Sequence, residues 1–175
     1  MASLRDTLPA TIHTERLVLA APSLAHVPDM AVLANNRAIY EVLERLPHPY
    51  DESHGRYFVE TVARGPEEFA WSILLDGHYV GTMGLNLPPD RLPALGYWLG
   101  EPHWGKGYAT EAAHAVVAAA RAAGYGGLRS RALLSNTGSR NVLRKAGFAE
   151  IGEDVVESGM HQGKSVVLLR LELTP

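Results

Sequence analysis

The stretch that decides the fold reads Tyr97-Trp98-Leu99-Gly100-Glu101-Pro102-His103-Trp104-Gly105-Lys106-Gly107-Tyr108-Ala109-Thr110-Glu111. It continues an apolar and aromatic run that begins at residue 94 and predicts a buried strand. After it, residues 110–123 are almost all Ala and Val, which predicts a helix. A strand that enters a helix through a glycine-rich turn directs several unpaired backbone N–H groups at one point, where the helix dipole favours an anion. The stretch therefore predicts a phosphate-binding loop.

Two common nucleotide-binding loops fit this stretch poorly. Residues 100–106 nearly match the nucleoside-triphosphate loop, but Gly107 stands where that loop needs a Ser or Thr for magnesium. Pro102, inside the same loop, has no N–H to offer a phosphate. Residues 105–110 begin like a dinucleotide fingerprint, but Thr110 replaces its third glycine.

Length and composition limit the class of protein. The 175 residues predict a single domain, residues 1–175, that is large enough to bury a core. Because the chain has no cysteine, disulfides, thiolate metal sites and cysteine nucleophiles are excluded. The N-terminus lacks the apolar core of a signal peptide, and the 110–123 helix is too short to cross a bilayer. We therefore expect a cytoplasmic protein with no membrane partner.

Charge is distributed unevenly along the chain. Residues 106–145 contain seven Lys or Arg and one acid, Glu111, within a chain whose net charge is −3. This asymmetry predicts a polyanionic ligand beside a surface that favours a cation, although scattered solvated charges would give the same count. A nucleic acid would also be polyanionic, but the acidic remainder of the chain argues against one.

The rest of the chain alternates strands and helices without repeats or linkers. Ser23, Asp51 and Ser139 are expected to cap helices, and Pro47 and Pro49 to end one. The expected strands are 15–19, 68–75, 78–87, 94–99, 128–133, 148–157 and 165–173. The expected helices are 23–34, 38–46, 51–63, 110–123 and 139–147.

A second motif reads Asn136-Thr137-Gly138-Ser139-Arg140-Asn141-Val142-Leu143-Arg144-Lys145-Ala146-Gly147-Phe148. Together with Trp104-Gly105-Lys106-Gly107-Tyr108-Ala109 and the opening Thr14-Glu15-Arg16-Leu17, it resembles the GNAT acetyltransferase superfamily. The likeness is to the branch that contains the ribosomal-protein alanine and serine N-acetyltransferases. Gly107 and Ala109 match the family's pyrophosphate loop, whereas Trp104 stands where the family usually has Gln or Arg.

The resemblance covers residues 14–173 and implies an α/β (α+β) GNAT fold in a single domain. The expected sheet is mixed, mostly antiparallel, of about seven strands and flanked by helices. It is splayed at its middle, where the pantetheine arm of coenzyme A inserts. The order of the expected strands and helices agrees with this fold.

The resemblance also implies a function: transfer of an acetyl group from acetyl-coenzyme A to a primary amine by direct attack on the thioester, with no metal. The acceptor is a protein N-terminus or a small-molecule amine, and the enzyme a monomer or homodimer. A non-catalytic acyl-coenzyme A sensor is an alternative, because Trp104 departs from the pattern and Ala94 stands where several relatives carry a Glu. A nucleic-acid-binding protein is a third hypothesis for the function.

Site residues follow from the two motifs. Main-chain groups of the central strand, the glycine loop and polar side chains of the second motif are expected to hold acetyl-coenzyme A. These residues are Trp98, Leu99, Gly100, Trp104, Gly105, Lys106, Gly107, Tyr108, Ala109, Thr110, Asn136, Asn141, Arg144 and Lys145.

Three residues are expected to act in catalysis. The Leu99 N–H would stabilise the oxyanion. Ser139 matches the serine proposed to protonate the leaving thiolate, and a helix cap is an equally good explanation of this serine. Glu111 matches a recurrent family position, although the helix dipole alone also favours an acid there. The base that deprotonates the amine is left open among Glu68, Glu101, His103 and Glu111, and Tyr97 is expected in the core.

Overall fold

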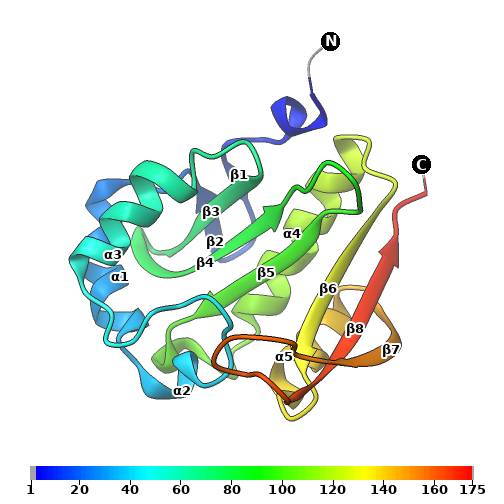
Figure 1. Cartoon of the computed structure of the whole chain (residues 1–175). Helices are drawn as coiled ribbons and strands as arrows, with labels where there is room; N and C mark the ends of the chain where they lie inside the picture. Colours follow the sequence, from blue (N-terminus) through cyan, green and yellow to red (C-terminus); the bar gives the residue numbers. More distant parts are fainter. Residues whose placement is uncertain (1–2, 175) are drawn as a thin grey trace.

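Strand β5 (Ala94–Leu99) lies near the middle of one eight-stranded sheet in the computed structural model, which describes residues 3–174 (Figure 1). The strand order is β1-β2-β3-β4-β5-β6-β8-β7. The other strands are β1 (Ile12–His13), β2 (Leu17–Ala20), β3 (Glu68–Leu75), β4 (His78–Asn86), β6 (Gly127–Leu133), β7 (Ala149–Val155) and β8 (Ser165–Glu172). The helices are α1 (Val27–Ala34), α2 (Arg37–Tyr40), α3 (Glu52–Tyr57), α4 (Tyr108–Ala122) and α5 (Thr137–Lys145), with short turns η1 (Leu4–Thr7), η2 (Leu24–His26), η3 (Phe58–Val62) and η4 (Glu101–His103).

The sheet is splayed between β5 and β6. Antiparallel neighbours β3, β4 and β5 share long ladders, but the parallel strands β5 and β6 pair at a single position in the described residues, Ala94 with Arg129. Beyond that position the two strands separate toward the C-terminal end of β5, where the chain enters the glycine loop. The expected mixed, mostly antiparallel and splayed sheet is confirmed.

Alternation along β5 sends its side chains to two different layers. Leu95 and Leu99 join the main core under α4, whereas Trp98 packs on the opposite face with Tyr79 and Met30 of α1. Figure 1 shows α4 and α5 behind the sheet and α1 to α3 in front of it. The two layers of helices therefore cover opposite faces of the sheet.

Helix α4 forms because its small apolar residues recur on one face. Its buried positions are Ala112, Ala113, Val116, Val117 and Ala120, which is the spacing of a helix face against a sheet. Within the part of the chain that the structure describes, no helix combines the length and the apolar character needed to cross a membrane.

Most expected elements form, with some corrections. Strands 68–75 and 94–99 have the expected bounds, but the sheet has eight strands instead of about seven, since β1 is too short to show alternation. The second helical segment is one turn, α2. The 51–63 helix changes to a π-helical turn, η3, after Tyr57.

The cap of the last helix was predicted wrongly. Asn136, not Ser139, is the N-cap of α5, and its Oδ1 accepts a hydrogen bond from the Ser139 N–H at 3.1 Å. The helix therefore begins earlier than expected, and Ser139 lies in its first turn with its hydroxyl available for other contacts.

Candidate active site

The glycine loop directs unpaired N–H groups toward solvent. Gly105 and Gly107 have φ angles of +72° and +82°, which glycine adopts without strain, and Gly107 is the N-cap of α4. The first amide of the helix to find an acceptor is that of Glu111, which donates to the Gly107 carbonyl at 3.0 Å. The preceding amides of Tyr108, Ala109 and Thr110 are therefore free for an anion, and the exposed Lys106 adds a positive charge.

Trp104 joins the loop to the end of the central strand. Its indole Nε1 donates to the Leu99 carbonyl at 2.7 Å, while 43% of the residue remains exposed. A Gln or Arg at this position, as expected from the resemblance, would also carry N–H donors. The Trp therefore keeps a donor at this place and adds an exposed aromatic surface.

The hydrogen-bond alternation of β5 decides which main-chain groups face the splay. The Gly100 N–H donates to the Val80 carbonyl at 2.8 Å, so Gly100 and Trp98 direct their main-chain groups toward β4. Leu99 and Tyr97 then direct theirs toward the side from which β6 has separated. Of the three residues expected to offer main-chain groups to a ligand, Leu99 has its N–H there, whereas Trp98 and Gly100 are engaged by β4.

Tyr97 and Ser139 meet under the splay. The Tyr97 hydroxyl donates to Ser139 Oγ at 3.2 Å. Burial raises the pKa of Tyr97, and the bond to Ser139 opposes that shift in part, so the phenol is protonated at neutral pH. Tyr97 was expected only in the core. The clue in the sequence was its place between Leu95 and Leu99, on the α4 side of the strand.

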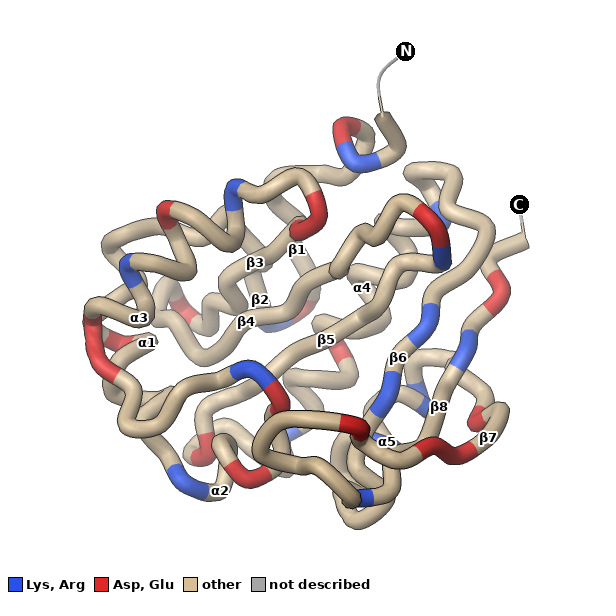
Figure 2. The backbone as a smooth tube through the Cα atoms, in the orientation of Figure 1, with Lys and Arg blue, Asp and Glu red and all other residues tan. Residues whose placement is uncertain are grey.

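The remaining residues of the second motif lie on α5. Asn141, Arg144 and Lys145 are exposed, and Arg144 Nη2 donates to Asn141 Oδ1 at 2.9 Å. Helix α5 packs beside α4, so these polar groups border the layer that begins at the glycine loop. Figure 2 shows further Lys and Arg residues along β6 and β8.

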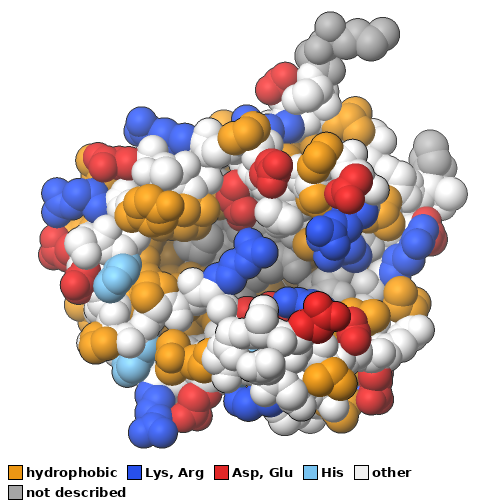
Figure 3. All heavy atoms as spheres, in the orientation of Figure 1, with side chains coloured by type: hydrophobic (Ala, Val, Ile, Leu, Met, Phe, Trp, Pro, Cys, Tyr) orange, Lys and Arg blue, Asp and Glu red, His pale blue; other side chains and the backbone are white. Residues whose placement is uncertain are grey.

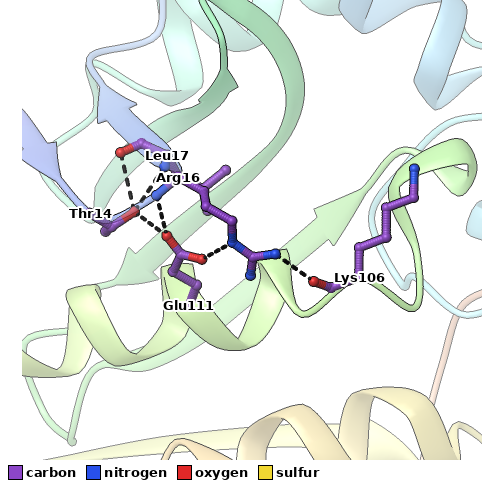
Figure 4. A network of polar contacts seen from close by, with 5 residues as sticks. All are labelled: Thr14, Arg16, Leu17, Lys106 and Glu111. Carbon is purple, nitrogen blue, oxygen red and sulfur yellow. Dashed lines mark hydrogen bonds and ion pairs between the residues drawn. The ribbon is translucent and has the colours of Figure 1, made fainter.

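Glu111 belongs to a network that ties the glycine loop to β2 (Figure 4). Its Oε1 accepts hydrogen bonds from Thr14 Oγ1 at 2.6 Å and the Arg16 N–H at 2.8 Å, and its Oε2 accepts from Arg16 Nε at 2.7 Å. Arg16 Nη1 donates onward to the Lys106 carbonyl at 2.9 Å, and its guanidinium lies 4.5 Å from the Tyr108 ring centroid. Burial alone would raise the pKa of Glu111, but the bonds from Thr14 and Arg16 hold it below its ordinary value.

The four candidate bases have different surroundings. Both carboxylate oxygens of Glu111 are engaged as described, and Glu101 Oε2 accepts from Asn36 Nδ2 at 2.5 Å. Burial and the charge of Lys106 lower the pKa of His103. Glu68 is half-buried on β3, and burial raises its pKa. No group of three or more acidic or His side chains in residues 3–174 is arranged to hold a metal ion.

Comparison with protein families and solved structures gives concordant results. The model of the acetyltransferase (GNAT) domain family matches residues 16–149. Comparison with curated protein sequences gives no significant match.

Solved structures resemble the whole chain. Microcin C7 self-immunity acetyltransferase MccE, in complex with acetyl-CoA and AMP, has a TM-score of 0.83 at 18% identity, covering 95% of this chain and 98% of that one. RimL, a ribosomal L7/L12 α-N-protein acetyltransferase in complex with coenzyme A, has a TM-score of 0.82 at 19% identity, covering 95% and 97%. The Salmonella typhimurium enzyme that modifies the N-terminal serine of ribosomal protein L7/L12 has a TM-score of 0.79 at 19% identity, covering 95% and 99%. At these identities the likeness establishes the fold.

Proposed function

Because the chain belongs to the GNAT acetyltransferase family and is an acyl-coenzyme A-dependent N-acetyltransferase, we propose that residues 104–110 hold the pyrophosphate of acetyl-coenzyme A. The free amides of Tyr108, Ala109 and Thr110 would bind the phosphate oxygens. The exposed Arg144 and Lys145 on the adjacent helix would neutralise the remaining phosphate charge, with Asn141 as a further donor.

Within the splay, main-chain groups of β5 would bind the pantetheine arm. The N–H groups of Leu99 and Tyr97 face this side of the strand. We assign the Tyr97 N–H, which adjoins Gly96, to the oxyanion of the tetrahedral intermediate in place of the expected Leu99 N–H. The Asn136 side-chain amide, whose oxygen already caps α5, retains N–H donors for the arm.

Ser139 is proposed to protonate the leaving thiolate. Its oxygen accepts a hydrogen bond from Tyr97, so its own hydroxyl proton is free to be donated. Glu111, in contrast, is proposed to position the loop through Arg16, because hydrogen bonds engage both of its oxygens and hold its pKa below the ordinary value, which makes it a weaker base. This replaces the catalytic role expected for Glu111.

The single observation that supports this site best is the separation of β5 from β6 beyond Ala94 and Arg129, directly before a helix N-terminus with free amides. The enzyme transfers the acetyl group to a primary amine. As acceptors we propose protein N-termini first, because two of the similar structures are enzymes of ribosomal protein L7/L12, and small amines second. We also propose a cytoplasmic enzyme, monomeric or homodimeric.

A thermal-shift titration tests the binding step. Acetyl-coenzyme A at 100 times its Kd should add about 2.7 kcal/mol of stability and raise the Tm by about 5–10 °C, whereas ATP and NAD should not. Lys106→Gln should weaken acetyl-coenzyme A about fivefold at low salt, and the control Arg37→Gln, exposed on α2, should not. Release of the coenzyme A thiol with peptides that begin with Ser or Ala, and with small amines, then measures transfer. A larger shift with ATP would refute the assignment of the loop.

A further inference from the structure

We infer that the acceptor amine lies on the front face of the sheet over Gly84 and Gly96, and that the Glu68 carboxylate takes its proton. The inference rests on the proposed function, because it names the acceptor side of the same site. Glu68 would then touch the substrate and act as the general base of the reaction.

Two glycines leave the floor of this site without side chains. Gly84 of β4 and Gly96 of β5 are register partners, so their missing side chains leave adjacent stretches of bare backbone. A Cβ at Gly84 would lie 3.1 Å from Glu68 Oε1, which places the carboxylate over that glycine. A Cβ at Gly96 would meet no atom within 4 Å, and Gly96 is exposed. The carboxylate therefore borders open space over the central strand.

The register of the sheet explains why a carboxylate on β3 can reach the space over Gly84 and Gly96. Glu68 pairs with Asn86, and Asn86 pairs with Ala94, so the three residues form one row across β3, β4 and β5. The carboxylate of this row is on β3, and because Gly84 has no side chain, that carboxylate can extend toward β5.

The space above the glycines is bounded on its other sides. The segment between α2 and α3 crosses to the C-terminal half of the sheet, where the Leu43 carbonyl meets His161 Nε2 at 3.1 Å and Glu44 forms an ion pair with Arg131. Figure 3 shows this face hollowed near its centre, with a basic side chain in the hollow and acidic side chains around it. An acceptor thus enters between the front helices and β6.

Glu68 is also the candidate base whose surroundings best suit it to accept a proton. Glu111 and Glu101 are engaged by hydrogen bonds, whereas the Glu68 carboxylate forms no ion pair among the described residues. Burial raises its pKa, against the opposing effects of the Asn86 amide and the charge of Arg45. A carboxylate with a raised pKa is a stronger base than an exposed one, which suits it to accept a proton from the amine.

The proton balance of the step is complete. The acceptor ammonium gives one proton to Glu68, and the freed nitrogen lone pair attacks the thioester carbon. The tetrahedral intermediate then gives its second nitrogen proton to Ser139 Oγ as the Ser139 hydroxyl gives its own proton to the sulfur and the C–S bond breaks, so Ser139 ends as a hydroxyl again. Glu68 releases its proton to solvent when the products leave.

Basic side chains on the β6 side of this space favour an acceptor that also carries a negative charge. Arg129 and Arg131 lie on β6, and Arg45, on the bridging segment, is exposed and has no ion pair among residues 3–174. Arg45 follows Glu44, which forms an ion pair with Arg131, so Arg45 lies near the β6 side of this space. The favoured acceptor is therefore a primary amine with an anionic group a few atoms away, such as a peptide whose second residue is acidic.

Steady-state kinetics across about pH 6 to 10 test the inference. With a peptide acceptor, Glu68→Gln should lower kcat/KM for the amine about tenfold near pH 7, with KM for acetyl-coenzyme A unchanged. The loss should disappear as the pH passes the amine's own pKa, about 8 for a peptide N-terminus. The matched control, Glu67→Gln, removes the exposed neighbouring carboxylate and should leave the profile of the wild-type enzyme. Gly96→Ala, which has room in the fold, should raise KM for the amine about tenfold.

The outcomes separate this inference from the proposed function. A Glu68→Gln enzyme with the wild-type rate and pH profile would overturn the inference and leave the acetyltransferase assignment intact. A wild-type enzyme that binds acetyl-coenzyme A but acetylates no amine would overturn the proposed function itself. If Arg45, Arg129 and Arg131 favour an anionic acceptor, the wild-type enzyme should acetylate Ser-Asp peptides faster than Ser-Ala peptides, and Arg45→Gln should lose this preference. Equal wild-type rates with both peptides would refute the preference for an anionic acceptor.

Discussion

The Tyr97 hydroxyl donates a hydrogen bond to Ser139 Oγ at 3.2 Å, and this contact links the central strand to the first turn of α5. Burial raises the pKa of the phenol, so Tyr97 remains a donor at neutral pH. The Ser139 N–H is fixed by the Asn136 side chain, which orients the residue from its other end. A hydroxyl that accepts one hydrogen bond is a better donor in its own right, because linked hydrogen bonds polarise one another.

The first prediction follows from this pair. Ser139→Ala should lower kcat about 100-fold with little change in KM for acetyl-coenzyme A, because the thiolate loses its proton donor. Tyr97→Phe should lower kcat about tenfold, since Ser139 remains but is less polarised. Since both act on one proton transfer, the double variant should be no slower than Ser139→Ala alone.

Coenzyme A release in the steady state measures these rates. Tyr125→Phe is the control, because Tyr125 also packs against the main core and its hydroxyl forms no hydrogen bond in the described residues. If the losses from Tyr97→Phe and Ser139→Ala multiplied in the double variant, the two hydroxyls would act independently. The proposal that Tyr97 acts by polarising the Ser139 hydroxyl would then be wrong.

Local sequence patterns predicted the part of the site that local geometry builds. The strand 94–99, the loop with Gly105 and Gly107 and the start of α4 depend on side-chain alternation, positive φ angles and helix propensity, all of which act over a few residues. The second motif likewise placed Ser139 near the start of a helix, although its cap was assigned to the wrong residue.

Contacts between residues far apart in the sequence depend on how the strands pair, and local patterns could not predict them. Tyr97 meets Ser139 across 42 positions, and Glu68 leans over Gly84 because β3 and β4 pair in one particular register. A shift of that register by one residue would turn Glu68 to the other face of the sheet. The sequence therefore named Glu68 as one of four candidate bases without distinguishing it from the others.

Gly107→Ala should damage both the fold and the loop. At a φ of +82°, an Ala costs about 1–2 kcal/mol, which corresponds to a fall in Tm of about 2–8 °C. Its Cβ would also lie 3.3 Å from Arg16 Nη2, so Arg16 must shift from the loop that it supports. We therefore expect the Kd of acetyl-coenzyme A to rise about tenfold.

Gly163→Ala separates the two effects. Gly163 also has a φ of +82° but meets no atom within 4 Å of its Cβ position, so the strain is matched and the contact with Arg16 is absent. It should lose similar stability in thermal unfolding and keep its affinity for acetyl-coenzyme A in calorimetry. Equal loss of affinity in both variants would show that global stability, not the loop, controls binding.

Arg16→Met should affect binding more than chemistry. The Met keeps an apolar stem of similar length but loses the hydrogen bond to the Lys106 carbonyl and the ion pair with Glu111. A looser loop should raise KM for acetyl-coenzyme A about five- to tenfold while kcat stays within about twofold of the wild-type value. A fall in kcat without a change in KM would place Arg16 in the chemical step instead.

Glu111→Gln should lower stability in a way that depends on pH. The folded pKa of Glu111 lies below its value of about 4.3 in the unfolded chain, so the ionised group stabilises the fold above that pH. As pH falls through the folded pKa, this contribution is lost. Denaturant unfolding should show a difference of about 1 kcal/mol between wild type and variant at pH 7 that disappears in acid. The control Glu52→Gln removes an exposed ion pair with Arg56 and should change little. A difference that persisted unchanged in acid would exclude the charge of Glu111 as its cause.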